Sequence, residues 1–153
     1  MKKFSKVMCL VLAVAMAFCF AACGSKDGGD GGDNANELYI GGIGPLSGDY
    51  ANYGTSVKNG CELAVKEINA AGGINGMQVT LDFQDSQGDP DSAVSAYGLL
   101  MDNGMDVSLG GVLSGETASI VAAAKADGLL VLTPSGSAKD CINGNDSAFR
   151  VCF

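Results

Sequence analysis

Histidine and tryptophan are both missing from this chain of 153 residues, and positive charge is scarce. Without histidine the chain has no Ser-His-Asp or Cys-His catalytic group and no histidine-ligated metal site. Its 9 Lys and Arg residues are outnumbered by 17 Asp and Glu residues, which gives a formal net charge of -8. Because phosphate backbones repel a chain this acidic, the composition argues against nucleic-acid binding.

The sequence motifs of common enzymes are incomplete as well. The stretch Gly42-Ile43-Gly44-Pro45-Leu46-Ser47 lacks the third glycine of a dinucleotide fingerprint and has a proline in the turn. The serine in residues 111–115 is misplaced for a nucleophile elbow, and no phosphate-loop lysine pattern occurs. We therefore expect no enzyme, no cofactor and no metal site.

The N-terminus has the pattern of a secretory signal peptide. Lys2, Lys3 and Lys6 precede an uncharged, mostly apolar run over residues 7–20. A membrane-spanning helix needs about twenty apolar residues, whereas a run of this length after basic residues is typical of an export signal. We expect residues 1–22 to be removed on export, which makes the remaining chain still more acidic.

The residues around Cys23 resemble the lipobox of bacterial lipoproteins. The stretch is Phe20-Ala21-Ala22-Cys23-Gly24-Ser25. In that family a signal peptidase cuts before the cysteine, and the thiol then receives a diacylglycerol. The resemblance implies an extracytoplasmic protein, lipid-anchored through Cys23 to the outer face of the cell membrane, although Phe20 stands where an aliphatic residue is usual. A plain secreted protein is the alternative.

Residues 23–36 are rich in Gly, Asp and Asn, with nothing in the glycine-rich part that a core could bury. We expect this segment to be a flexible linker between the lipid and a folded domain. Its aspartates do not form a calcium loop, because the turn glycine, the intervening ligands and the terminal glutamate are missing.

From residue 37 onward, short apolar runs alternate with segments of helical periodicity. The pattern predicts strands at about residues 38–43, 77–83, 107–112, 129–132 and 149–153, and helices at about residues 52–70, 89–103 and 117–126. Asp89-Pro90 is a typical helix start and Gly128 a typical helix end. The first helix has an apolar face that we expect to be buried, with Val57, Cys61, Ala64, Val65 and Ile68. Such alternation predicts an α/β fold, a doubly wound parallel sheet with helices on both faces.

In such sheets a ligand binds beyond the carboxyl ends of the strands. Three segments lie there, residues 45–54, 114–117 and 133–138, and all are rich in Ser, Thr and Gly. Ser114 and Thr117 begin a predicted helix, where free backbone N–H groups favour an anion. Ser135 and Ser137 can donate to a carboxylate, while nearby carbonyls accept from an ammonium. The two strand ends together suit the head group of an α-amino acid, and the alternative is that these residues are ordinary helix caps.

Tyr53 and Glu116 lie in the same segments and allow two interpretations each. The Tyr53 ring can form a wall of the ligand site or simply pack at a helix start. Glu116 can attract an ammonium, but its place in the first turn of a helix is equally explained by the helix dipole, which is the interpretation we favour.

The residues named so far resemble the leucine/isoleucine/valine-binding family of ABC-importer receptors. The resemblance covers residues 37–153, and its most specific stretch is Glu67-Ile68-Asn69-Ala70-Ala71-Gly72-Gly73-Ile74-Asn75-Gly76. It implies a type I periplasmic-binding-protein fold with two lobes that close on a ligand. It also implies that the partners are a small molecule, namely an amino acid of branched-chain type, and the ABC permease subunits, and that the protein is a monomer. By position the resemblance assigns ligand contacts to Ser114, Ser135, Ser137, Thr117 and Tyr53.

The same resemblance implies that much of a receptor is missing. Members are more than twice this length, so we expect residues 37–153 to be a partial N-terminal lobe, and a second lobe to supply the partner of the ammonium and the side-chain pocket. Members also bind amides, urea or aromatic acids, and the same fold serves as the sensing domain of signalling receptors. Some relatives carry a disulfide at the positions of Gly88 and Leu113, so that bridge is absent here. Cys141 and Cys152 can pair instead in an oxidising compartment.

Overall fold

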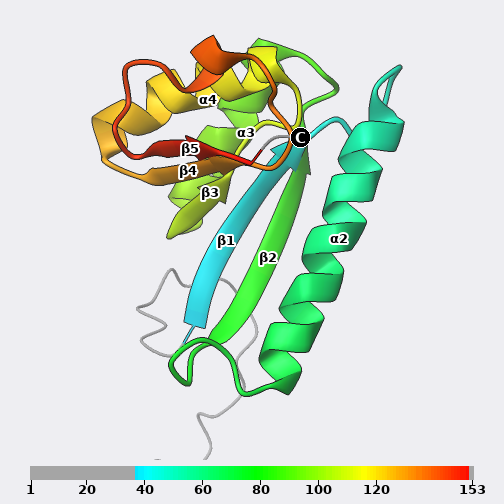
Figure 1. Ribbon diagram of the computed structural model, residues 1–153, viewed down its shortest axis with the longest axis vertical. Helices are drawn as coiled ribbons and strands as arrows, with labels where there is room; N and C mark the ends of the chain where they lie inside the picture. Colours follow the sequence, from blue (N-terminus) through cyan, green and yellow to red (C-terminus); the bar gives the residue numbers. More distant parts are fainter. Residues whose placement is uncertain (1–36, 152–153) are drawn as a thin grey trace, which may run out of the picture. The chain divides into compact units, whose positions relative to one another are not determined.

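The computed structural model describes residues 37–151, which form a sheet of five strands with helices packed against it. The signal peptide, the linker, Cys152 and Phe153 lie outside the described residues. In chain order the elements are β1 (Glu37–Gly44), α2 (Ala51–Ala70), β2 (Gln78–Asp85), α3 (Pro90–Asp102), β3 (Val107–Leu109), α4 (Ser114–Asp127), β4 (Leu130–Thr133), the 3-10 helix η1 (Lys139–Ile142) and β5 (Ala148–Arg150) (Figure 1).

All neighbouring strands run parallel, in the order β2-β1-β3-β4-β5. The longest pairing joins β1 and β2 from Glu37 beside Gln78 to Gly44 beside Asp85. The chain moves from β1 to one side and then returns to β3 on the other, so a topological switch point lies between β1 and β3. The predicted α/β class and doubly wound parallel sheet are confirmed.

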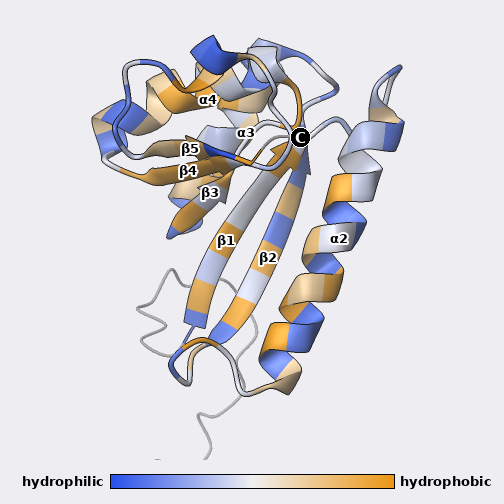
Figure 2. Ribbon diagram, viewed as in Figure 1, coloured by the Kyte–Doolittle hydropathy of each residue, from blue (hydrophilic) through white to orange (hydrophobic). Residues whose placement is uncertain are grey.

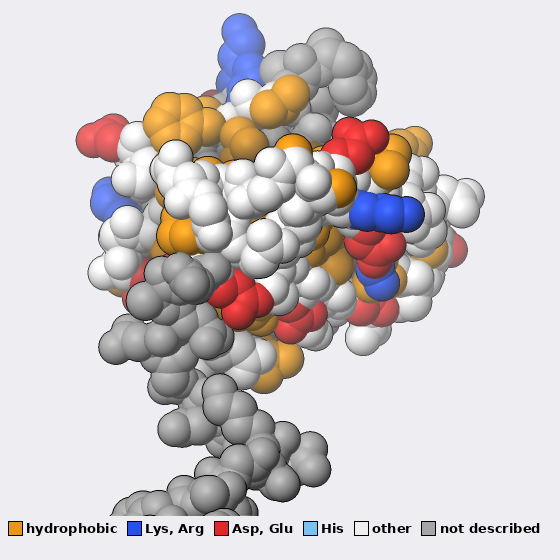
Figure 3. All heavy atoms as spheres, turned by 90° about the horizontal axis from the view of Figure 1, so that it is seen from below, with side chains coloured by type: hydrophobic (Ala, Val, Ile, Leu, Met, Phe, Trp, Pro, Cys, Tyr) orange, Lys and Arg blue, Asp and Glu red, His pale blue; other side chains and the backbone are white. Residues whose placement is uncertain are grey.

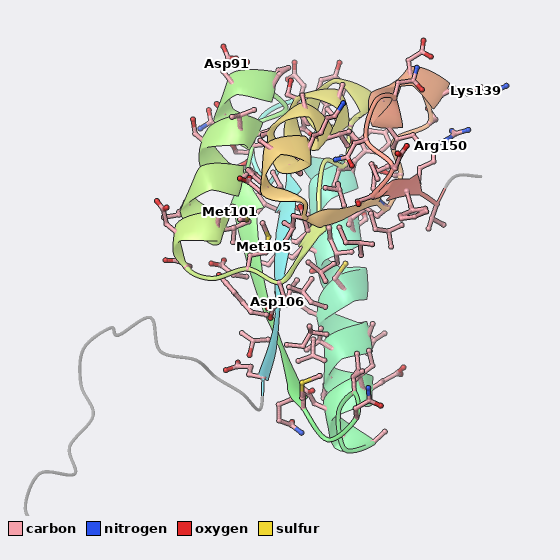
Figure 4. The ribbon with its side chains drawn as sticks, turned by 90° about the vertical axis from the view of Figure 1, so that its left-hand side faces the viewer. Asp91, Met101, Met105, Asp106, Lys139 and Arg150 are labelled. Carbon is pink, nitrogen blue, oxygen red and sulfur yellow. The ribbon has the colours of Figure 1, made fainter. Side chains whose placement is uncertain are left out.

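Helices cover both faces of the sheet (Figure 1). Right-handed crossovers require this, because α2 leads from β1 to one neighbour whereas α3 and α4 lead in the opposite direction. The main core lies between the sheet and the pair α3 and α4. Its members are Ile43, Ala93, Ala96, Tyr97, Leu100, Met105, Ile120, Val121, Ala124, Val131 and Ala148. Met105 lies beside Gly41 of β1, where a larger residue would collide with its sulfur (Figure 4).

The face of α2 differs from the expectation. Polar and apolar residues alternate along this helix (Figure 2), but within it only Gly54 is buried. Cys61 is half-buried, and Ala64 is exposed, so neither is the core residue that the helical periodicity predicts. The reason is tertiary, because α2 packs mainly against two strands, β1 and β2, so its apolar side meets a narrow strip of sheet.

Two element boundaries near the carboxyl edge also differ from the prediction. The strand β3 ends at Leu109 rather than Val112, because Gly111 turns the chain with a φ of 67°. The helix α4 begins at Ser114, three residues before the expected start. The predicted signals at the start of α3 and at the end of α4 are confirmed. The Asp89 carboxylate accepts from the Ser92 N–H at 2.8 Å, and Gly128 adopts the left-handed conformation.

Charged side chains are dispersed over the surface. Lys and Arg lie among acidic, apolar and uncharged side chains, with no continuous basic area on the face that Figure 3 shows. The one ion pair in residues 37–151 joins Lys58 and Glu62, one turn apart on α2. No helix in this part of the chain has the length and apolar character needed to cross a membrane.

Two neighbouring leucines of α3 test the position of the core. Leu100 is 0% exposed and Leu99 is 48% exposed. We expect Leu100→Ala to lower the free energy of unfolding by about 2–5 kcal/mol, because it leaves a cavity between α3 and the sheet. The matched change Leu99→Ala should stay within about 0.5 kcal/mol of the parent chain. Urea unfolding of both variants checks this, and equal losses would contradict the packing described.

Candidate functional site

The carboxyl ends of the parallel strands bring four connecting segments to one edge of the sheet. They follow β1, β2, β3 and β4 and comprise residues 45–50, 86–89, 110–113 and 134–138. This edge lies at the arrowheads of β1 and β2 in Figure 1. The three segments that the sequence indicated are therefore neighbours in space, and the segment after β2 joins them.

Two buried threonines hold the segments after β3 and β4 together. Thr117 and Thr133 are both fully buried, and their hydroxyl oxygens lie 3.2 Å apart. The Thr133 hydroxyl donates to the Gly111 carbonyl at 2.7 Å and accepts from the Gly136 N–H at 2.9 Å. The Thr117 hydroxyl lies 2.9 Å from the carbonyls of both Gly111 and Leu113. We call this hydrogen-bonded group of Thr117, Thr133, Gly111 and Gly136 the threonine node.

Steric constraints require glycine at both Gly111 and Gly136 of the threonine node. A Cβ atom at Gly111 would overlap the Thr117 hydroxyl and backbone, and the φ of this residue is 67°. A Cβ at Gly136 would lie 2.7 Å from the Thr133 hydroxyl. Only glycine lets the two chain segments approach the threonines this closely.

Two predicted serines cross-link the same two segments. The Ser114 hydroxyl accepts from the Ala138 N–H at 3.1 Å, and the Ser135 hydroxyl donates to the Val112 carbonyl at 2.7 Å. Ser114 keeps its own proton to donate elsewhere, and Ser137 is exposed. The structure therefore brings Ser114, Ser135 and Ser137 together, while their contacts with a ligand stay predictions.

Ser114 is not an ordinary helix cap. It is the first residue of α4, and the N-cap residue is Leu113, which makes no side-chain capping bond. The first N–H groups of a helix have no acceptor within the helix, and they carry the positive end of its dipole. The exposed Gly115 leaves this end of α4 open. Such an end binds anions such as a carboxylate.

Thr117 and Tyr53 occupy very different surroundings. Thr117 has no exposed surface, and its hydroxyl is engaged in the threonine node, so the role that the structure supports is to shape the site. Its predicted ligand contact stays a prediction. Tyr53, in the first turn of α2, is 63% exposed, so its ring does not simply pack at the helix start.

Sequence reasoning missed Tyr50, whose exposed ring lies over Gly88. A Cβ at Gly88 would lie 3.2 Å from the Tyr50 ring and 3.7 Å from Leu113. The only sequence signal was its place in the same segment as Tyr53. Gly88 and Leu113 are thus close together, as the resemblance to bridged relatives implied.

Asp85 was assigned no role from the sequence, yet its hydrogen bonds fix the segment after β1. Its carboxylate accepts from the Leu46 N–H and the Gln87 N–H, both at 2.8 Å, and from the Ser47 hydroxyl at 2.6 Å. Burial acts to raise the pKa of Asp85, but these hydrogen bonds outweigh it and hold the pKa below its usual value. An aspartate that ends a strand beside two Ser- and Gly-rich loops was the signal available.

Arg150 is a further residue that only the structure identifies. Its guanidinium donates to the Ser137 carbonyl at 2.8 Å and so holds the segment after β4 against the end of β5. Arg150 and Lys139 lie on the same side of the domain (Figure 4). Arg150 lies 13 residues from Ser137 in sequence, which hid this contact.

Of the three cysteines with a predicted disulfide or lipidation role, the structure describes Cys141. Cys141 is buried, and its sulfur lies 3.9 Å from the Gly136 carbonyl. Its proposed partner Cys152 lies outside the described residues, so this disulfide stays a prediction. The lipidation site Cys23 lies outside them too. Among residues 37–151 no group of three or more His, Cys, Asp or Glu side chains could hold a metal ion.

Comparison with known proteins identifies a family and several relatives of this chain. The family model for "periplasmic binding protein" matches residues 37–152. The Leu/Ile/Val-binding protein homolog 3 of Brucella melitensis is 37% identical over 117 residues, which cover 76% of this chain and 32% of that protein. The Leu-, Ile-, Val-, Thr- and Ala-binding protein of Pseudomonas aeruginosa is 32% identical, with 69% of this chain and 28% of that protein covered.

Solved structures of similar fold include further proteins of this kind. The branched-chain amino acid transporter substrate binding protein LivJ of Streptococcus pneumoniae, in complex with isoleucine, has a TM-score of 0.70 and 35% identity, and 74% of this chain and 33% of that chain are covered. The leucine binding protein LivK of Thermotoga maritima, 23% identical with a TM-score of 0.69, shows the fold alone. The chain spans about a third of the length of these relatives.

Two buried hydroxyls on neighbouring strands provide a test of the threonine node. The Thr133 hydroxyl has three hydrogen-bond partners, whereas the fully buried Ser108 hydroxyl has none within the described part of the chain. We expect Thr133→Val to lower the free energy of unfolding by about 1–3 kcal/mol, because it strands the Gly136 N–H. Ser108→Ala should leave it unchanged or raise it by up to about 1 kcal/mol. Urea unfolding measures both, and a loss of equal size in the two variants would refute the assignment.

Proposed function

The chain belongs to the periplasmic binding protein family, in its branched-chain amino acid group. From this membership we propose that residues 37–153 are part of the N-terminal lobe of a solute-binding receptor. The receptor serves an ABC importer and binds an amino acid, of branched-chain type, between two lobes. The observation that carries the proposal is the convergence of the free N-terminus of α4 with Ser114, Ser135 and Ser137 at one edge of the sheet.

This edge suits a carboxylate better than an ammonium. The first N–H groups of α4 and the hydroxyls of Ser114 and Ser137 are donors for an anion. By contrast, the Val112 carbonyl already accepts from Ser135, and the Ser137 carbonyl already accepts from Arg150. The lobe described therefore holds the carboxylate end of the ligand, and we assign the partner of the ammonium to the second lobe.

The contacts of the serines support binding rather than catalysis. Ser114 bonds to a backbone N–H and Ser135 to a backbone carbonyl, so neither has a base positioned to remove its proton. A nucleophile requires such a base within hydrogen-bond reach. We therefore propose that this chain is not an enzyme.

Export and anchoring complete the proposal. Family membership supports an extracytoplasmic location. The N-terminal lysines, the apolar run and the lipobox-like residues support removal of residues 1–22 and lipidation of Cys23. The permease subunits of the importer are then the protein partners, and the receptor acts as a monomer held by its lipid anchor.

A titration of the exported chain with L-leucine, followed by two-dimensional NMR, tests the binding site. We expect the backbone amide signals of Ser114, Gly115 and Ser137 to shift, with a dissociation constant in the millimolar range or weaker, because residues 37–153 supply one side of the proposed cleft. Ser114→Ala should reduce the shifts several-fold, since it removes a hydroxyl donor next to the carboxylate.

Leucinamide, which lacks the carboxylate, is the matched control ligand, and it should leave these signals in place. Micromolar or tighter binding of leucine by this chain alone would contradict the proposal that residues 37–153 supply only one side of the cleft. Shifts that are equal for leucine and leucinamide would contradict the assignment of the carboxylate to this lobe.

Growth of bacteria that express the chain with a radioactive fatty acid tests the anchor. We expect the parent chain to carry the label and Cys23→Ala to carry none, because the thiol that would receive the diacylglycerol is gone. Cys61→Ala, which changes a cysteine in α2, is the control and should be labelled as the parent is. Equal labelling of Cys23→Ala would refute lipidation at this residue.

A further inference from the structure

Glu116 is a buried carboxylate that links the segment after β2 to the start of α4. It is 1% exposed, and Ser86 is 0% exposed. The Ser86 hydroxyl donates to Glu116 Oε1, and the Leu113 N–H donates to Glu116 Oε2 at 3.0 Å. The two oxygens of one carboxylate thus hold two different chain segments, a link that we call the Glu116 tether.

Ser86 is itself fixed by its neighbours. Its N–H donates to the Gly44 carbonyl at 3.0 Å, and its carbonyl accepts from the Asp89 N–H at 2.9 Å. The first bond ties Ser86 to the end of β1, and the second ties it to the N-cap of α3. The Glu116 tether therefore connects the start of α4 to a point held by two other elements.

No cation neutralises Glu116, because the one ion pair in residues 37–151 lies on α2. Burying a carboxylate without a cation is unfavourable unless hydrogen bonds and local dipoles compensate. Here the compensation comes from the Ser86 hydroxyl, the Leu113 N–H and the positive end of the α4 dipole. The Glu116 side chain consequently has one arrangement in which both of its oxygens are hydrogen-bonded. This arrangement fixes the distance between Ser86 and Leu113.

The tether acts on the residue next to the candidate site. Leu113 is the N-cap of α4 and has no side-chain acceptor, so the Glu116 carboxylate is what orients its N–H. Ser114 follows directly, with the hydroxyl that meets the segment after β4 and the first free N–H groups of the helix. Release of the tether would let this first turn move away from the ligand position while the core under α3 and α4 stays packed.

We propose that Glu116 and Ser86 are positioning residues of the ligand site. They do not touch the ligand, and they set the place of Ser114 and the α4 N–H groups relative to the segment after β2. This inference rests on the proposed function, since it concerns affinity for the carboxylate of an amino acid. It also assigns a second role to a glutamate that the helix dipole alone would explain.

The L-leucine titration, applied to three variants of the exported chain, tests the proposal. Ser86→Ala leaves Glu116 Oε1 without its donor, and we expect the dissociation constant to rise about tenfold. Glu116→Ala should have an effect at least as large. Glu116→Gln should stay within about threefold of the parent, because its amide oxygen can accept from the Leu113 N–H and its amide nitrogen can donate to Ser86.

Glu67→Gln, an exposed change on α2, is the control for loss of one negative charge and should bind as the parent does. Melting temperatures recorded on the same samples separate positioning from stability. A lower melting temperature for Ser86→Ala with an unchanged dissociation constant would overturn the proposal. If Glu116→Ala does not fold, Ser86→Ala decides, because it only shortens a small side chain.

The two proposals fail in different ways. A parent chain whose signals do not respond to L-leucine would overturn the proposed function and the positioning role with it. A parent chain that responds, together with a Ser86→Ala chain that responds equally well, would overturn the positioning role alone.

Discussion

The threonine node is the constraint on which the carboxyl edge of this domain depends. Thr117 belongs to α4, Thr133 ends β4, and both hydroxyls meet at the carbonyl of Gly111, just beyond β3. Burying polar atoms this deeply is unfavourable unless they are paired. The pairing therefore fixes the two segments relative to each other. It thereby also fixes the positions of Ser114 and Ser135, which bond across them.

Polar side chains fix the remaining segments of the same edge in a similar way. Asp85 gathers the backbone of the segment after β1, Glu116 joins the segment after β2 to α4, and Arg150 holds the segment after β4. None of these three residues needs to touch a ligand. Together they replace the flexibility usual in loops with a preformed surface, which lowers the entropy that binding would otherwise lose.

The two faces of the sheet contribute unequally to stability. The side of α3 and α4 contains the continuous core, with Leu100, Ile120 and Val131 fully buried. On the other side α2 is half-buried, and Leu130 and Phe149 of the outer strands are exposed apolar residues. The start of α4 and the threonine node thus belong to the well-packed face, whereas Tyr53 lies on α2, which covers the looser one.

The sequence by itself determined the class of the fold, because strand and helix periodicities, Asp89-Pro90 and Gly128 are local signals that tertiary contacts did not override. It also determined where polar ligand chemistry gathers, since parallel strands must end at one edge. Tertiary structure alone decided which polar residues at this edge stay exposed and which are buried in hydrogen bonds that hold the chain. Glu116 and Thr117 follow Ser114 within three residues, yet both are buried and bond to residues of other elements, namely Ser86 in the segment after β2 and Thr133 at the end of β4. No local pattern records a partner that lies sixteen or thirty residues away.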